Sequence, residues 1–325
     1  TIYSKFYRHP SPMLEKFNPS RDIFFLKKLL SYKNIIKYNK VLEIGCFDGF
    51  ILNKLKQKKF NVYGCEPSDG ANIAKKFGIK VKKNFFSKKL FINKKFDLII
   101  LRHTLEHIEN VNKFLKEIFH VMNDKSLFVI EVPNLRFYLN RGLLEVFSFQ
   151  HIHYFSIKTF RELAVKLNLK ILSATETPEN IIIFFKKNHI SRYKKVNKNT
   201  VKFKDFKKKI ISNKFLLNKI ISKFELKEII YWGAGGFAVA AMNLYKFPFN
   251  KDTVIIDKDK NKHGLSFSDI NLDIVPFSKK NFQNKKLIII TSYYSKEIIK
   301  KIKSCKVNIN VLQIFPKIKL LKFHG

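Results

Sequence analysis

The chain has 325 residues, of which 46% are hydrophobic and 27% charged, and it carries a formal net charge of +39. This length can bury a substantial core and predicts two domains. The sequence contains neither an apolar run long enough to cross a membrane nor a signal peptide, which argues against a membrane-spanning protein. The three cysteines, Cys46, Cys65 and Cys305, lack metal-ligand spacing, so we expect a reducing cytoplasm, no disulfides and no zinc.

The positive charge alone would suggest a nucleic-acid partner. Lys, Asn, Ile and Phe are enriched together along the whole chain, however, which is typical of a coding bias toward A and T. Nucleic acid is therefore an unlikely partner, while the charge still favours an anionic small-molecule substrate. Because the chain begins at Thr1 and lacks an initiator Met, we expect it to be a piece of a longer protein.

After a lead-in segment at 1–40, with helical periodicity over 22–36, short apolar strands alternate with helices. This alternation is typical of parallel strands covered on both faces. The expected strands are 41–45, 61–66, 80–86, 96–102 and 126–132, and the expected helices are 49–59, 69–77 and 110–122.

The next stretch, 135–155, is aromatic and shows no clean period. Ser156 then predicts the cap of a helix. The strands expected at 169–175 and 180–186 are joined by only three residues, which demands an antiparallel pair. Five parallel strands closed by an antiparallel hairpin predict an α/β class: the Rossmann-like sheet of a class I methyltransferase.

A second, smaller Rossmann-like α/β unit is expected after a polar linker. The linker covers 189–202 and leads into a helix at 204–224. Further strands are expected at 228–232, 253–257, 286–291 and 309–315, with a helix at 295–303. The predicted organisation is a lead-in at 1–40, a cofactor domain at 41–188, a linker and helix at 189–227, and a C-terminal domain at 228–325.

The end of the first strand predicts a nucleoside cofactor site. Gly45 lets the backbone approach a ligand, and Gly49 lets the next helix start close to the strand. Glu66 ends the second strand, where a carboxylate can accept both ribose hydroxyls. Glu43 favours S-adenosylmethionine (SAM) over NAD, because SAM carries a sulfonium and an ammonium and no phosphate, whereas a dinucleotide needs a free helix N-terminus.

Two further residues are expected at the same sheet edge. Phe85, near the end of the third strand, is placed to contact the adenine ring or to pack in the core. His103 follows the fourth strand and is expected near the methionine end of SAM. Glu106 and His107 are expected to organise that loop.

A second Gly-rich turn follows the strand at 228–232. Gly233, Gly235 and Ala238, with Asp257 nineteen residues after Ala238, fit the dinucleotide fingerprint. Taken alone, this pattern suggests NAD binding, and the alternative is a structural role; the family resemblance given below implies a third, contact with a nucleotide sugar.

Four motifs occur in order: Cys-Glu-Pro-Ser at 65–68, His-Thr-Leu-Glu-His at 103–107, Glu-Val-Pro-Asn at 131–134, and Gln-His-Ile-His-Tyr-Phe-Ser at 150–156. With them, the chain resembles the sugar-nucleotide C-methyltransferase family of SAM enzymes over nearly its whole length. The resemblance implies a SAM domain joined to a C-terminal Rossmann-like domain that helps hold the nucleotide sugar.

The resemblance also implies site residues. His151 matches the family histidine and is expected to act as base or to position the substrate, and Tyr154 matches the tyrosine. Gln150 stands where the family has glutamate; an amide orients His151 but cannot raise its basicity as a carboxylate does. Asn134 and His153 are expected to contact the substrate.

The start of the chain resembles the segment that follows the family's small zinc domain, so Tyr3 is also expected at the sugar. No paired CxxC motif is present, so either the chain starts after the zinc domain or this branch lacks it.

The expected function is SAM-dependent methylation of a nucleotide-activated sugar or related carbohydrate precursor in the cytoplasm, at carbon. The first alternative is O-methylation of a surface-polysaccharide precursor. A second alternative, of another class, is a non-catalytic protein that binds nucleotide sugar or nucleic acid.

Overall fold

The computed structural model describes residues 11–14, 20–143, 147, 150–187, 203–250, 253–265 and 273–324. The chain divides into two compact units. The first comprises Thr1–Leu135 and Phe149–Asn199, and the second comprises Arg136–Ser148 and Thr200–Gly325. The stretch 136–148, which we expected in the cofactor domain, groups with the C-terminal unit, and the helix expected at 204–224 also lies there. The predicted linker at 189–202 lies outside the described residues, and the predicted domain limits stay a prediction.

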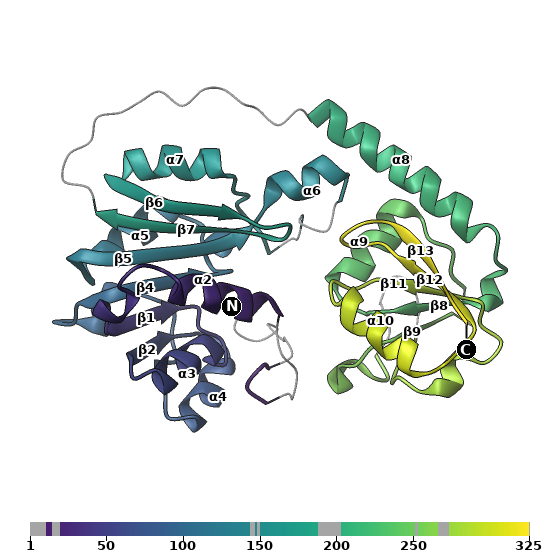
Figure 1. Ribbon diagram of the computed structural model, residues 1–325, viewed down its shortest axis with the longest axis horizontal. Helices are drawn as coiled ribbons and strands as arrows, with labels where there is room; N and C mark the ends of the chain where they lie inside the picture. The colour runs from purple at the N-terminus through teal and green to yellow at the C-terminus, as the bar shows by residue number, and fades with distance from the viewer. Residues whose placement is uncertain are drawn as a thin grey trace. The chain divides into compact units, whose positions relative to one another are not determined.

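The first unit is built on a seven-stranded sheet in the order β3-β2-β1-β4-β5-β7-β6 (Figure 1). Strands β1 to β5 are parallel, and β7 runs antiparallel to both β5 and β6. This is the predicted class I arrangement, with the strand order reversing at β1 and β4. The strands are β1 Lys40–Ile44, β2 Asn61–Cys65, β3 Lys80–Lys82, β4 Phe96–Arg102, β5 Met122–Pro133, β6 Leu169–Glu176 and β7 Asn180–Lys187.

Helices cover both faces of this sheet. Helices α5 (Val111–Phe119) and α7 (Ile157–Lys166) bury their apolar side chains with Leu42, Ile99 and Phe128 on one face. The other face is covered by α2 (Ser20–Leu30), α3 (Phe50–Gln57) and α4 (Gly70–Lys76). Burial on both faces explains why each central strand is a continuous apolar run.

Some predicted boundaries were wrong. Strand β3 stops at Lys82, so Phe85 lies beyond it, and α5 ends at Phe119, so that Met122 already belongs to β5. The expected cap is confirmed: the Ser156 hydroxyl accepts a hydrogen bond from the Thr159 backbone amide at the start of α7, and the Thr159 hydroxyl accepts one from the Ser156 amide.

The second unit holds a six-stranded sheet in the order β10-β9-β8-β11-β12-β13. Its first five strands are parallel, and β13 is antiparallel to β12. The strands are β8 Ile229–Trp232, β9 Val254–Ile256, β10 Asp273–Val275, β11 Leu287–Ile290, β12 Ile309–Gln313 and β13 Lys319–Phe323. The helices of this unit are α6 Leu135–Arg141, α8 Phe203–Ile221, α9 Gly236–Tyr245 and α10 Ser295–Ser304. Strands β10 and β13 and helix α6 were not predicted.

Helix length and polarity were also compared with what a bilayer requires. Within the described ranges, no helix combines the length and the apolar character needed to span a membrane.

Candidate functional site

Glu43 lies near the carboxyl end of β1, at the edge where parallel sheets bind ligands. Its side chain is 2% exposed, and Oε2 has no hydrogen-bond partner among the described residues. Burial raises the pKa of this carboxyl to about 8, although Arg102 opposes the shift. A buried acid with an unused oxygen fits a cationic ligand, as the sequence predicted for SAM.

Two glycines in the turn after β1 are required by the backbone conformation there and by the atoms packed around them. Gly45 has φ +75°, and a Cβ there would lie 2.2 Å from the Thr104 hydroxyl oxygen. Gly49 has φ +78° and precedes α3; a Cβ there would lie 2.9 Å from the Cβ of Ala74. Both positions therefore need glycine for backbone conformation and for close packing of neighbouring loops and helices.

Glu66 follows β2 and links two loops. One carboxylate oxygen accepts the amide N–H of Phe47 at 3.0 Å, and the other accepts that of Ser68 at 2.8 Å. The side chain is 2% exposed. Each oxygen keeps a second acceptor position, so the arrangement is compatible with a ribose diol. Ribose contact by Glu66 stays a prediction.

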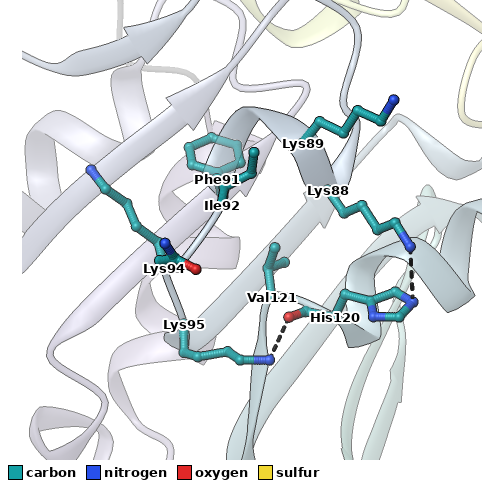
Figure 2. A pocket seen from close by; sticks show the side chains of 9 residues that line it. Lys88, Lys89, Phe91, Ile92, Lys94, Lys95, His120 and Val121 are labelled. Carbon is teal, nitrogen blue, oxygen red and sulfur yellow. Dashed lines mark hydrogen bonds between the residues drawn. The ribbon is translucent and has the colours of Figure 1, made fainter.

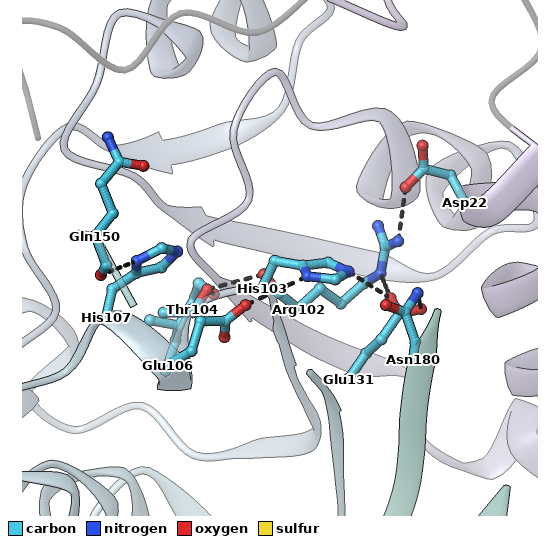
Figure 3. Close-up of polar contacts among 10 residues, drawn as sticks. Asp22, Arg102, His103, Thr104, Glu106, His107, Glu131, Gln150 and Asn180 are labelled. Atoms are coloured by element: carbon cyan, nitrogen blue, oxygen red, sulfur yellow. Dashed lines mark hydrogen bonds and ion pairs between the residues drawn. The ribbon is translucent and has the colours of Figure 1, made fainter. Parts of the chain in front are cut away.

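A buried polar row, not found from the sequence, crosses the same edge (Figure 3). The Arg102 guanidinium lies 2.7 Å from the Glu131 carboxylate and 2.6 Å from the Asp22 carboxylate on α2. Asn180 on β7 donates to the other Glu131 oxygen at 2.8 Å. Arg102 and Glu131 are register partners on β4 and β5, so the row ties α2 to three adjacent strands.

His103 follows β4 with φ +46°. Its Nδ1 lies 3.3 Å from a Glu106 oxygen, and its Nε2 has no hydrogen-bond partner among the described residues. Burial, together with the charges of Arg21 and Arg102, lowers the pKa of His103 well below its usual value. A neutral imidazole therefore faces the site. Contact with the cofactor stays a prediction.

The loop after β4 meets the segment that carries the motif histidines. His107 Nδ1 lies 2.8 Å from the Gln150 carbonyl oxygen, and the imidazoles of His107 and His151 pack edge to face at 5.1 Å. The main-chain carbonyl of Glu106 accepts hydrogen bonds from the backbone amides of Ile152, at 2.9 Å, and His153, at 3.1 Å. Gln150 and His151 are therefore brought to the sheet edge, as expected.

The remaining motif residues are placed as follows. The Tyr154 ring packs against His151 at 6.2 Å, whereas His153 Nε2 contacts the Glu109 carbonyl at 3.2 Å, away from His107. Asn134 is 4% exposed and donates to the Thr177 carbonyl. This Asn134 contact is structural, so a substrate role for its amide group stays a prediction.

Phe85, which was named for contact with adenine, lies beyond β3 and outside the motif segments. Phe85 is 50% exposed, while its neighbour Phe86 packs against Phe91 and Phe114. Contact between the exposed Phe85 ring and adenine stays a prediction. Phe86, in contrast, packs against the core. Tyr3 lies outside the described residues.

A short N-terminal segment docks on the Gly45–Gly49 turn. The Asp48 carboxylate accepts the Ser11 hydroxyl at 2.7 Å and the Met13 amide at 2.9 Å on one oxygen, and the Phe50 amide at 3.0 Å on the other. Asp48 is 2% exposed. Residues 11–14 are thus attached to the candidate cofactor loop.

A cavity of about 330 Å³ lies elsewhere on this unit (Figure 2). It is lined by lysines, among them Lys88, Lys94 and Lys95, and by His120. Lys95 directly precedes β4, and His120 precedes β5. The cavity therefore lies at the amino ends of these strands, opposite the edge that carries Glu43 and His103.

The second Gly-rich turn is held by Asp257. Its carboxylate accepts the amides of Ala234 at 2.7 Å and Asp259 at 2.8 Å, and Lys262 Nζ lies 3.2 Å away. A Cβ on Gly235 would meet no atom within 4 Å. The packing of the unit does not require this glycine, and nucleotide contact there stays a prediction.

The raised pKa of Glu43 predicts a pH-dependent stability. The folded protein keeps the Glu43 proton up to about pH 8, whereas the unfolded chain releases it near 4.5. Stability is therefore lost as the pH rises between these values. The free energy of unfolding of Glu43→Gln, relative to that of wild type, is expected to rise by roughly 2 kcal/mol from pH 6 to pH 8. Urea unfolding at both values measures this gain; an equal difference at both would contradict it.

The matching family model is described as a methyltransferase domain and covers residues 15–174. The ubiquinone biosynthesis O-methyltransferase of Rickettsia felis is 27% identical over 130 residues, covering 38% of this chain and 52% of that protein. That of Rickettsia canadensis is 28% identical over 131 residues, covering 38% and 54%. This chain thus spans about half the length of these curated relatives.

Solved structures were matched at low identity. The PH0226 protein of Pyrococcus horikoshii OT3 has a TM-score of 0.46 at 19% identity, covering 58% of this chain and 99% of that one. The plantazolicin methyltransferase BpumL, in complex with a triazolic desmethylPZN analog and SAH, has a TM-score of 0.41 at 17% identity, covering 52% and 84%. From the family model, with the strand order and the turn after β1, we conclude that the first unit is a class I SAM-dependent methyltransferase domain, whose cofactor is S-adenosylmethionine.

Proposed function

We propose that the protein transfers the methyl group of SAM to a small-molecule acceptor held beside His151 and Tyr154. One observation carries this proposal: Glu43 is buried at the end of β1 with an oxygen that has no partner among the described residues. Such a group is stabilised by keeping its proton or by a nearby cation, and the methionine end of SAM provides an ammonium and a sulfonium.

The cofactor would be held by groups that converge on the turn after β1. Glu43 faces its positive end, the free acceptor positions of Glu66 suit the ribose hydroxyls, and the exposed ring of Phe85 suits the adenine. SAM supplies an electrophilic methyl group on sulfur. The protein aligns the acceptor with it and excludes water, which is the main source of rate enhancement in such a displacement.

The acceptor attacks the methyl carbon, the carbon–sulfur bond breaks with its electron pair going to sulfur, and the acceptor proton goes to a base. A carbon acceptor must first become an enolate, whereas an oxygen acceptor needs only its hydroxyl deprotonated. His151 is the proposed base or positioning group. One ligand atom of Glu106 and one of His151 lie within 4.8 Å of each other, so a carboxyl group is near His151 although Gln150 is an amide.

For the acceptor, we propose a nucleotide-activated sugar methylated at carbon. Support comes from the four motifs and from the second Rossmann-like unit, which the family resemblance implies for a nucleotide sugar. The second candidate is O-methylation, which is favoured by the curated relatives, because they are named O-methyltransferases.

Incubation with labelled SAM and a panel of nucleotide sugars and hydroxylated compounds tests this function. We expect label in one nucleotide sugar and a new carbon-bound methyl signal by NMR; a methoxy signal would select the second candidate. His151→Ala is expected to lower kcat by about 100-fold or more with unchanged SAM binding. The matched control is His120→Ala, at the opposite sheet edge, with activity close to wild type. If no SAM binds by calorimetry, the proposed function is wrong.

A further inference from the structure

Three side chains with metal-binding atoms converge beside the methyltransferase edge. Glu106, His107 and His151 each offer one ligand atom, and these atoms all lie within 4.8 Å of one another. Glu106 and His107 lie in the turn Leu105–His107 after β4, and His151 comes from a segment more than forty residues further along. The cysteine spacing gave reason to expect no zinc, but this donor set contains no cysteine.

The carboxylate of Glu106 is buried without hydrogen-bond partners among the described residues. The residue is 1% exposed, and neither carboxylate oxygen has a hydrogen-bond partner among the described residues. His103 Nδ1 is near one oxygen, at 3.3 Å, but without hydrogen-bond geometry. A carboxyl held in this way is stabilised either by keeping its proton or by a cation.

His107 is oriented in the way that metal ligands commonly are. Its Nδ1 lies 2.8 Å from the Gln150 carbonyl oxygen (Figure 3). Because a carbonyl can only accept, Nδ1 donates, and the lone pair of the neutral ring is on Nε2. A main-chain carbonyl on the far nitrogen is the usual outer-shell partner that fixes the tautomer and the ring of a ligating histidine.

The two segments that carry the three side chains are locked to each other. The Glu106 carbonyl accepts the amides of Ile152 and His153, and the Gln150 carbonyl accepts from His107. These contacts flank His151 on both sides along the chain. The cluster is therefore held by main-chain bonds and does not depend on surface side chains meeting by chance.

We propose that Glu106, His107 and His151 bind one divalent transition-metal ion, with Zn²⁺ as the best match. Two imidazoles and one carboxylate suit Zn²⁺ and leave a fourth position open. Ligand atoms around tetrahedral zinc are about 3.3 Å apart, so the three side chains would close by up to about 1.5 Å on binding.

The proposed function gives this ion a role. An open position beside His151 would take an acceptor oxygen, whether a hydroxyl or the carbonyl next to a carbon to be methylated, and would favour its loss of a proton. A nitrogen that binds metal cannot also accept a proton, so His151 would then act as a ligand and not as the base. This role rests on the proposed function; the binding of metal does not.

The test uses protein freed of metal with a chelator. Calorimetry with Zn²⁺ and visible absorption with Co²⁺ are expected to show one ion per chain. Glu106→Gln and His151→Ala are each expected to weaken binding by about 100-fold or more. His120→Ala is the matched control and is expected to bind as wild type does. Thermal unfolding checks that each variant is folded.

Absence of stoichiometric binding to wild type would overturn the proposal, as would equal affinity in Glu106→Gln. Titration of the same metal-free protein with S-adenosylhomocysteine separates the two proposals. If this compound binds and Zn²⁺ does not, the metal site alone is wrong. If Zn²⁺ binds and this compound does not, the methyltransferase assignment fails and the metal site stands.

Discussion

Replacing Arg102 with methionine is expected to lower the free energy of unfolding by about 3–5 kcal/mol, because it leaves a buried carboxylate without its cation. Glu131 is 1% exposed and would keep the hydrogen bond from the Asn180 amide, with the His103 imidazole 3.9 Å away. Asp22 would lose the group that connects α2 to the sheet. The Phe25 ring would also lose the guanidinium, which lies 4.4 Å from its centroid. Equilibrium unfolding in urea measures the loss.

The double variant Arg102→Met with Glu131→Gln separates charge from packing. It removes the stranded charge, and its amide oxygen can still accept from Asn180, so we expect it to regain more than half of the lost stability. The matched surface control is Lys158→Met, which breaks an exposed pair with Glu162 and should change stability by less than about 0.5 kcal/mol. If the single and double variants have the same midpoint of urea unfolding, the loss of stability comes from packing.

The first sheet could be predicted because each of its parallel strands is a short apolar run between helices. The short linker between β6 and β7 allowed only an antiparallel pair, and the structure has it. By contrast, α6 carries Phe137, Tyr138 and Leu139, all buried, so its apolar residues follow no helical stripe. Strand β13 is exposed along most of its length, and its Lys-Leu-Leu-Lys-Phe sequence lacks strict alternation.

The candidate site likewise contains residues that the sequence predicted and residues that it did not. Glu43 lies near the end of β1, and Gly45 and Glu66 directly follow β1 and β2, so the sequence pattern predicted their places at the sheet edge. The row from Arg102 to Glu131 and Asn180 depends on the register between strands, which local pattern does not determine. One signal was available: Arg102 ends β4, Asn180 begins β7, and Glu131 interrupts an apolar run two residues before the end of β5.

The convergence of Glu106 and His107 with His151 required the tertiary fold. These residues come from segments more than forty positions apart, and main-chain bonds between the two segments bring the side chains together. In the sequence the first two were expected only to organise their loop. Their proximity to His151 is what makes a shared ligand conceivable.

Replacing Gly45 with alanine is expected to lower the free energy of unfolding by about 3 kcal/mol and to weaken binding of S-adenosylhomocysteine. The backbone at φ +75° costs alanine about 1–2 kcal/mol. The added Cβ would also lie 2.2 Å from the Thr104 hydroxyl oxygen. The single hydrogen of this hydroxyl is shared between the Arg102 carbonyl at 3.0 Å and the Ile44 carbonyl at 3.2 Å. Either the hydroxyl or the turn must move, at a further cost of about 1–3 kcal/mol.

A double-mutant cycle with Thr104→Ala tests this origin. Removing the hydroxyl relieves the collision but not the unfavourable φ, so the two changes together should cost at least about 1 kcal/mol less than the sum of the single changes. Gly142→Ala is a matched control in the other unit, with φ +64° but no contact with Thr104, and its cost should add to that of Thr104→Ala. If Gly45→Ala and Thr104→Ala are also additive, the glycine is required only for its backbone conformation. The packing of the turn after β1 on the loop after β4 would then make no contribution to stability.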